Sequence, residues 1–245
     1  MREVAPPIPR DDSALFLDID GTLIDIAATP RAVDVSAGLP ALLGRLSRRF
    51  KGSLALVSGR CLDDIDSLFR PFRFPAAGIH GAERRDALGT LHFAGLTSED
   101  LAPAREELRR FVARHPALLL EDKGRGLALH FRQAPELESA VREVLEQVRI
   151  RLPPEAHLQP GHCVIELKGG SANKREAIDE FLQEPPFSGR VPVYLGDDLT
   201  DMDALHHVQS VGGLGIFVGP EPVPGLGWLP SPAAVVEWLR SLDTA

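Results

Sequence analysis

Four apolar residues lead directly into two carboxylates in the stretch Ala14-Leu15-Phe16-Leu17-Asp18-Ile19-Asp20-Gly21-Thr22. A short apolar run that ends in a glycine turn is typical of a strand buried on both faces of a parallel sheet. Ligands bind at the carboxyl ends of such strands. Because burying two like charges is costly without a compensating cation, Asp18 and Asp20 predict a divalent metal at this sheet edge.

The same stretch has two simpler interpretations. A calcium-binding loop of the EF-hand type needs glycine at its sixth position, but Leu23 stands there and Gly21 comes fourth. The calcium loop is therefore excluded. A turn that is merely rich in aspartate stays open on this motif alone.

The composition is that of an ordinary soluble globular protein, with 44% hydrophobic and 25% charged residues in a chain of 245. This length allows one large domain, or a core with a smaller inserted domain. Acidic residues outnumber basic ones by 35 to 27, for a net charge of -8. No run of lysine or arginine forms a nucleic-acid stripe, so we expect no nucleic-acid partner.

The cysteine content and the hydropathy pattern bear on the compartment. Cys61 and Cys163 lie far apart without metal-ligand spacing, which indicates neither a disulfide framework nor a zinc site. Residues 1–10 lack an apolar signal segment, and no window is continuously apolar over the roughly 18 residues of a membrane span. We therefore expect a cytoplasmic protein with no membrane partner.

Both ends of the chain alternate strand and helix patterns. Strand-like runs at 14–19 and 53–57 enclose a leucine repeat at 39–49 with helical spacing, which predicts a βαβ unit. Further buried strands are predicted at 191–195 and 215–218. This alternation favours a doubly wound parallel sheet of Rossmann type, an α/β fold.

The middle of the chain has a different pattern. Residues 127–132 and 163–168 alternate apolar and polar positions, as in a sheet with one polar face. Amphipathic helices are predicted at 98–114 and 135–150. We therefore predict an inserted α/β cap domain at 83–168, within a catalytic core made of 1–82 and 169–245.

Two further segments carry chemistry that suits an anion. Ser58-Gly59-Arg60 follows a buried strand and precedes a helix, so its hydroxyl and backbone N–H groups form an anion pocket or, equally, a turn with serine as a helix cap. Lys174 stands at a helix start, where the helix dipole disfavours a cation. A surface lysine remains the simple alternative for Lys174.

The segment Gly196-Asp197-Asp198-Leu199-Thr200-Asp201 follows the strand predicted at 191–195. Thr200 and Asp203 have the spacing of a capping box, which explains Asp201 and Asp203 as helix-start residues. Asp197 and Asp198 are not explained in that way. Their oxygens suit a hard cation such as Mg²⁺.

The ordered set Asp18-Ile19-Asp20-Gly21-Thr22, Ser58-Gly59-Arg60, Lys174 and Gly196-Asp197-Asp198 resembles the four core motifs of the haloacid dehalogenase-like phosphatase superfamily. Additional segments make the chain similar to the trehalose-6-phosphate phosphatase family from about residue 13 onward. They are His80-Gly81-Ala82-Glu83, Glu121-Asp122-Lys123-Gly124, Leu129-His130-Phe131-Arg132 and Val164-Ile165-Glu166-Leu167-Lys168.

The resemblance implies roles for the core residues. Asp18 would be the nucleophile that forms an aspartyl-phosphate, and Asp20 the general acid and base. The Asp18 carboxylate, the Asp20 backbone carbonyl and Asp197 would hold Mg²⁺, with Asp198 and Asp201 orienting those ligands. The phosphoryl oxygens would contact the following groups: Ser58, the Gly59 N–H and Lys174.

The resemblance also implies that the substrate is trehalose 6-phosphate, which is hydrolysed in the last step of trehalose biosynthesis. It further implies a functional coupling to a trehalose-6-phosphate synthase. Substrate-binding positions carried over from the family are Arg60, His80, Gly81, Glu121, Lys123 and Glu166, with Arg125, His130 and Arg132 as weaker candidates. Periodicity alone would make the residues of the middle segment ordinary solvent-facing charges.

Three alternatives stay open at this point. The core motifs equally fit a capped phosphatase for sucrose 6-phosphate, mannosyl-3-phosphoglycerate or a hexose phosphate. A non-catalytic regulatory module would have lost the nucleophile, whereas Asp18 is present. A phosphomutase would need a second phosphate site, and no motif indicates one.

Overall fold

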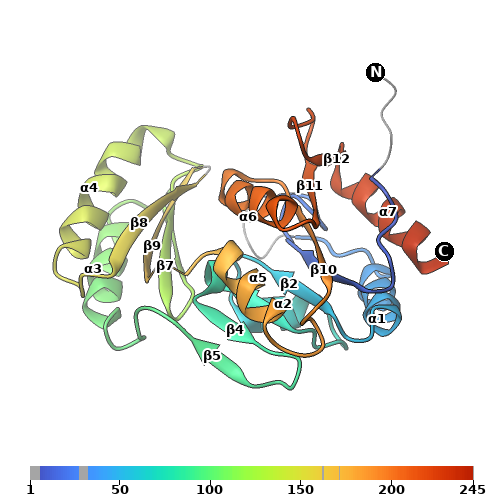
Figure 1. Ribbon diagram of the computed structural model, residues 1–245. Helices are drawn as coiled ribbons and strands as arrows, with labels where there is room; N and C mark the ends of the chain where they lie inside the picture. Colours follow the sequence, from blue (N-terminus) through green and yellow to red (C-terminus); the bar gives the residue numbers. More distant parts are fainter. Residues whose placement is uncertain (1–5, 28–32, 162, 171, 245) are drawn as a thin grey trace. The chain divides into compact units, whose positions relative to one another are not determined.

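The computed structural model describes residues 6–27, 33–161, 163–170 and 172–244 (Figure 1). Their contacts form two compact units, the first within 1–92 and 173–245 and the second within 93–172. Residues 83–92, assigned to the cap by the sequence analysis, instead extend the sheet of the first unit. The reason is that β4 (Glu83–Arg85) pairs antiparallel with β3 (Ala76–Gly78).

The first unit contains an eight-stranded sheet. Its strand order is β12 (Gly227–Leu229), β11 (Leu214–Val218), β10 (Val191–Gly196), β1 (Ser13–Leu17), β2 (Leu54–Val57), β3, β4 and β5 (Leu91–Phe93). Neighbouring strands from β12 through β3 are parallel. The predicted doubly wound α/β fold is therefore confirmed, with β4 added antiparallel to β3 and β5 beyond it at the edge.

Helices cover both faces of this sheet. Leu15 and Leu17 pack with α1 (Leu39–Arg49), α2 (Leu62–Leu68) and α7 (Pro232–Thr244). Ala14 and Phe16 pack on the other face with α5 (Lys174–Leu182) and α6 (Leu199–Ser210), which lie side by side in Figure 1. Because alternate residues of β1 enter two different cores, the whole strand is apolar and buried.

The strand order changes direction at β1. The chain leaves β1 toward β2 on one side, and later returns through β10 on the other side. Leu17 at the end of β1 pairs with Leu195 on β10. The loops that begin at Asp18 and Asp197 therefore meet at the topological switch point, where parallel α/β sheets bind ligands.

The second unit is a four-stranded antiparallel sheet with helices on one face. The strand order is β6 (Leu119–Asp122), β7 (Gly126–His130), β9 (Val164–Gly169) and β8 (Ala156–Gly161). Leu127, Leu129 and Ile165 share a core with α3 (Ala102–Ala113) and α4 (Glu138–Arg149), the latter preceded by the short η2 (Pro135–Leu137). The intervening positions form a cross-strand row of Glu121, Ala128, Glu166 and Gln159.

No helix among the described residues combines the length and the apolar character needed to cross a membrane. The predicted lack of a signal segment concerns in part residues 1–5, which lie outside the described residues.

The core packing can be tested at Leu43, which is fully buried on α1. We predict that Leu43→Ala lowers the free energy of unfolding by about 2–5 kcal/mol, because it removes buried methyl groups and leaves a cavity. Leu88→Ala is the matched control, since 91% of Leu88 is exposed. Urea denaturation should show a change of less than about 0.5 kcal/mol for this control; equal losses in both variants would contradict the described packing.

Candidate active site

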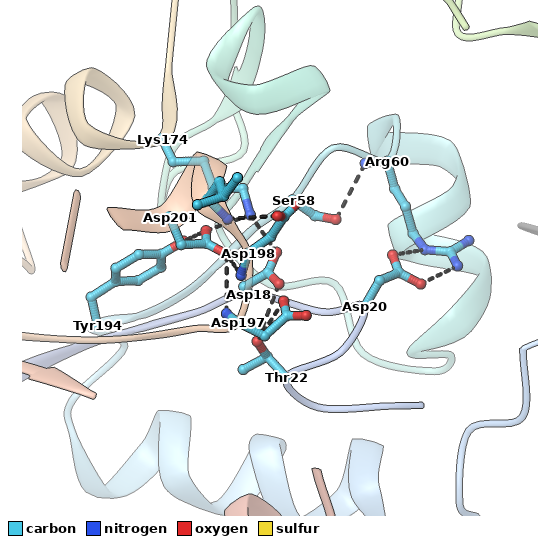
Figure 2. Close-up of polar contacts among 11 residues, drawn as sticks. Asp18, Asp20, Thr22, Ser58, Arg60, Lys174, Tyr194, Asp197, Asp198 and Asp201 are labelled. Carbon is cyan, nitrogen blue, oxygen red and sulfur yellow. Dashed lines mark hydrogen bonds and ion pairs between the residues drawn. The ribbon is translucent and has the colours of Figure 1, made fainter. Parts of the chain in front are cut away.

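Lys174, Asp18 and Asp201 form a buried row of charges at the carboxyl end of β1 (Figure 2). The Lys174 Nζ donates to Asp18 Oδ1 at 2.7 Å and to Asp201 Oδ1 at 2.6 Å. Only 4% of Lys174, 3% of Asp18 and 0% of Asp201 is exposed. Lys174 is the first residue of α5, and two carboxylates rather than water surround its ammonium. The interpretation of Lys174 as a surface residue is therefore wrong.

Thr22 links the loops that follow β1 and β10. Its Oγ1 lies 3.2 Å from Asp18 Oδ2 and 3.4 Å from Asp197 Oδ1, and its single proton can serve one of them at a time. Thr22 has no predicted role. Its place in the turn directly after the acidic pair was the available signal.

Gly21 allows Asp197 to approach the β1 loop closely. Gly21 has φ of +80°, and a Cβ built there would lie 1.9 Å from Asp197 Oδ2. A larger residue would therefore meet both a strained backbone and a carboxylate. This glycine helps to bring the carboxylates of Asp18 and Asp197 to the same point.

The start of α6 differs from the prediction. Asp198, not Thr200, is the N-cap, and its capping-box partner is Asp201 rather than Asp203. The predicted Thr200 and Asp203 box is therefore wrong, because the helix begins at Leu199. Asp201 Oδ2 accepts hydrogen bonds from the backbone N–H groups of Asp197 and Asp198, each at 3.1 Å.

Burial and mutual repulsion shift the acidity of this cluster. Burial, opposed by Lys174 and reinforced by Asp201 and Asp197, raises the pKa of Asp18 well above its usual range. Burial and the charge of Asp201 raise the pKa of Asp197 to about 7. Burial alone would lower the pKa of Lys174, but the attraction of Asp18 and Asp201 outweighs it and raises this pKa. Full ionisation of Asp18, Asp197 and Asp201 would therefore place more negative charge here than one ammonium offsets.

The donor set fits a hard divalent cation. Ligand oxygens of Asp18, Asp197 and Asp201 lie within 4.8 Å of one another. Asp201 is already engaged, since Oδ1 accepts from Lys174 and Tyr194 and Oδ2 accepts from two backbone N–H groups. Asp18 and Asp197 are thus the carboxylates suited to a cation, which would also offset the excess negative charge.

Asp20 points away from this cluster toward Arg60 (Figure 2). The Arg60 guanidinium donates to the two Asp20 carboxylate oxygens from Nε and Nη2, each at 2.6 Å. Arg60 is 7% exposed, so the pair is held in a partly desolvated position. Arg60 is predicted to bind substrate, and in the structure its guanidinium has the Asp20 side chain as a partner. A bidentate pair of this kind fixes the direction of the carboxylate.

Ser58 and Gly59 begin the loop after β2. Ser58 is 1% exposed, and its Oγ accepts from the Arg60 N–H at 3.2 Å. Its carbonyl accepts from the His80 N–H at 2.9 Å, which ties the loop to η1 (Ile79–Gly81), the turn that also carries Gly81. The residues predicted to contact phosphate or substrate from this side therefore come from two adjoining turns.

The alternative role of Ser58 as a helix cap is wrong. Cys61 is the N-cap of α2, without a side-chain cap bond of its own. Instead, Glu83 Oε1 on β4 accepts from the Leu62 N–H at 2.5 Å. The Ser58 hydroxyl is therefore not used to begin α2.

The residues predicted to recognise the sugar lie in the second unit. Lys123 Nζ donates to Glu166 Oε1 at 2.6 Å, and the two side chains are 7% and 14% exposed. The carboxylate of Glu121 lies 2.8 Å from His130 Nε2. Burial opposes the shift, but the bond from His130 and the charge of Lys123 lower the pKa of Glu121. These paired groups share the polar side of the sheet.

Arg125 has a different setting from the other candidates of this unit. Its Nη1 donates to the Leu96 carbonyl at 3.0 Å, and its guanidinium lies 4.4 Å from the centre of the Phe93 ring. Arg132 follows β7 and is exposed. Arg125 therefore has a packing role in addition to any contact with a ligand.

The fold and the site together define a haloacid dehalogenase-like hydrolase. Its features are a doubly wound parallel sheet with an acidic pair after the central strand, a buried lysine from a later helix, and a further carboxylate pair after the adjacent strand. Haloacid dehalogenase-like hydrolases are among the solved structures with this fold. This class uses a divalent metal, which the donor set described above accommodates.

Comparison with known proteins narrows the class. The family model of trehalose-phosphatase matches residues 16–224, and the chain belongs to this family. A protein of Sinorhizobium fredii named probable trehalose-phosphate phosphatase is 46% identical over 228 residues, covering 92% of this chain and 85% of that protein. Trehalose-6-phosphate phosphatase of Escherichia coli K12 is 40% identical over 232 residues, covering 95% of this chain and 87% of that protein.

A solved structure described as a trehalose-6-phosphate phosphatase related protein has a similar fold. Its TM-score is 0.77 at 25% sequence identity, and the match covers 95% of this chain and 97% of that one. The similarity therefore includes residues of both compact units.

The raised pKa of Asp197 predicts a pH-dependent response to metal. In the metal-free protein, Asp197 keeps its proton up to about pH 7, whereas its reference pKa is 3.8. The stability it contributes is therefore present below pH 3.8 and is lost as pH rises through 7. Because a cation needs the ionised form, millimolar Mg²⁺ should raise the melting temperature more at pH 8 than at pH 5.5.

The Asp197→Asn variant is the matched control for this experiment. Its metal-induced shift should be small at both pH values, because it lacks the ionising carboxylate. Scanning calorimetry with Mg²⁺ and with EDTA measures both proteins. An equal shift at the two pH values in the wild type would contradict the assignment of Asp197 to the metal.

Proposed function

We propose that this protein hydrolyses trehalose 6-phosphate to trehalose and inorganic phosphate through an aspartyl-phosphate on Asp18, with Mg²⁺ as the metal. The observation that carries the proposal is the Asp18 carboxylate at the switch point, with Lys174 bonded to one oxygen. Membership of the trehalose-phosphatase family and 40–46% identity to two proteins named as such phosphatases support the substrate.

The first step transfers the phosphoryl group to the protein. An Asp18 oxygen forms a bond to phosphorus while the bond between phosphorus and the sugar oxygen breaks. Asp20 gives a proton to the departing oxygen, so the sugar leaves as an alcohol. Both Asp20 oxygens accept from Arg60 in the structure, so this step requires Asp20 to leave that contact and to be protonated first.

The second step returns the nucleophile. Asp20, now ionised, takes a proton from water as the water oxygen bonds to phosphorus and the bond between Asp18 and phosphorus breaks. Inorganic phosphate leaves, and the Asp18 carboxylate is restored. Lys174, the Ser58 hydroxyl and the Gly59 N–H are the groups proposed to offset the charge on the phosphoryl oxygens in both steps.

The Asp18 carboxylate, the Asp20 carbonyl and Asp197 are proposed to hold Mg²⁺, with Asp198 and Asp201 orienting these ligands. When bound, the cation neutralises charge, so that an anionic nucleophile and an anionic phosphate can approach. The raised pKa values of Asp18 and Asp197 support this assignment, since burial and neighbouring carboxylates disfavour their ionised forms and a bound cation would compensate for that cost.

Sugar recognition is proposed for Glu121, Lys123 and Glu166, with His80, Gly81, Arg125 and His130 as further contacts. A polyol is recognised by directional hydrogen bonds, and charged side chains that are already oriented supply them with little loss of freedom. The short Lys123–Glu166 and His130–Glu121 contacts support such orientation. We also propose that the protein acts in trehalose biosynthesis in the cytoplasm and is functionally coupled to a trehalose-6-phosphate synthase. The sequence and the family support these proposals.

Phosphate release from a substrate panel tests the proposal. We predict a strong preference for trehalose 6-phosphate over sucrose 6-phosphate, glucose 6-phosphate and mannosyl-3-phosphoglycerate, and loss of activity with EDTA. Asp18→Asn should lower kcat by at least about a thousandfold, because the nucleophile is removed. Preference for another sugar would reject the substrate, and release from none of them would favour the non-catalytic module.

A second experiment tests sugar recognition separately from phosphate chemistry. We predict that Glu166→Gln raises KM for trehalose 6-phosphate by about tenfold or more, because a charged hydrogen-bonding group is lost. Hydrolysis of phenyl phosphate, which has no sugar, should change less than twofold. Glu146→Gln, at a 50% exposed side chain of the same unit, is the matched control; an unchanged KM for Glu166→Gln would reject this role.

A further inference from the structure

Tyr194 is the single tyrosine of the chain and is completely buried on β10. It pairs in register with Phe16 on β1 and belongs to the apolar cluster that includes Phe181 of α5 and Leu205 of α6. A phenylalanine would suit these apolar neighbours equally well. The hydroxyl therefore needs a separate explanation, because burying a hydroxyl without a partner is costly.

The hydroxyl points at one atom of the candidate active site (Figure 2). Tyr194 Oη donates to Asp201 Oδ1, the oxygen that also accepts from Lys174 Nζ at 2.6 Å. Lys174 Nζ in turn donates to Asp18 Oδ1 at 2.7 Å. A continuous chain of contacts therefore joins the Tyr194 hydroxyl to the proposed nucleophile.

Asp201 is fixed from its other sides as well. The backbone N–H groups of Asp197 and Asp198 hold Oδ2. A Cβ at Gly196 would lie 2.5 Å from Asp201 Cγ, so the carboxylate rests directly on the strand backbone. Tyr194 supplies the remaining contact, at the oxygen shared with Lys174. Burial and the charge of Asp201 raise the pKa of Tyr194, which keeps the phenol protonated as a donor.

We propose that Tyr194 is a positioning residue of the reaction, whose hydroxyl holds Asp201 so that the Lys174 ammonium stays directed at Asp18. The inference rests on the proposed function, which gives Asp18 and Lys174 their chemical roles. A lysine ammonium is a compact charge on a flexible stem, so its direction depends on its fixed partners. Small displacements of such a group reduce the stabilisation of a transition state.

The variant Tyr194→Phe tests the inference, because it removes the hydroxyl and keeps the ring. We predict that kcat for trehalose 6-phosphate falls about tenfold or more. Ser53→Ala is the matched control, since Ser53 is a fully buried serine whose hydroxyl bonds the backbone carbonyls of Ser13 and Phe50. Ser53→Ala should also lose stability, but its kcat should stay within twofold of the wild type.

A double-mutant cycle with Asp201→Ala separates positioning from packing. If Tyr194 acts through Asp201, adding Tyr194→Phe to Asp201→Ala should change kcat by less than twofold. An equal loss in both backgrounds, or a Tyr194→Phe variant with wild-type kcat, would overturn the inference. Should Asp201→Ala fail to fold, the comparison of Tyr194→Phe with Ser53→Ala decides alone.

Failure of the proposed function has a different signature. A wild-type protein that releases no phosphate from the substrate panel would reject that function. In that case the free energy of unfolding of the Tyr194→Phe, Asp201→Ala and double variants is measured by urea denaturation, without metal or substrate. Coupling between Tyr194 and Asp201 in the free energy of unfolding would support the contact, whereas additive losses would overturn it.

Discussion

The ammonium of Lys174, buried between Asp18 and Asp201, is the interaction on which the rest of the site depends. It ties the first turn of α5 to the loop that follows β1 and to the first turn of α6. Removing one partner of a buried ion pair typically costs about 3–5 kcal/mol, because it leaves an unpaired charge. Burial, together with neighbouring carboxylates that one ammonium does not offset, raises the pKa of Asp18 and of Asp197. Because ionising these buried carboxylates is unfavourable without further positive charge, the site favours binding of a divalent cation.

The parallel sheet explains why residues so distant in sequence meet. Leu17 and Leu195 are neighbours across β1 and β10, so the loops after them begin side by side. Thr22 and Gly21 then determine how closely these loops approach. The sheet thus provides a rigid base, and the short loops at its edge provide the reactive groups. Such an arrangement suits phosphoryl transfer, in which positioning and electrostatics supply most of the catalysis.

The parallel core was predictable because its central strands are continuous apolar runs and the helix at 39–49 repeats leucine at helical spacing. The strand at 83–85 was not, because Glu83-Arg84-Arg85 lacks an apolar pattern. Its arginines are buried through ion pairs with distant carboxylates, Glu180 and Glu184 for Arg84 and Asp66 for Arg85. The capping box was misplaced because Asp198 and Thr200 are both good caps, and only the tertiary contacts of Asp201 choose between them. The Tyr194 hydroxyl had no local signal, since its partner is defined by packing.

The most direct test of the account is to trap the intermediate on Asp18. The protein is mixed with trehalose 6-phosphate that carries a radiolabelled phosphoryl group and Mg²⁺, quenched with acid within milliseconds, and digested. The account predicts label on the peptide that contains Asp18, released by hydroxylamine and absent from Asp18→Asn. Rapid phosphate release without protein-bound label, or label on another peptide, would contradict the assignment of Asp18 as the nucleophile.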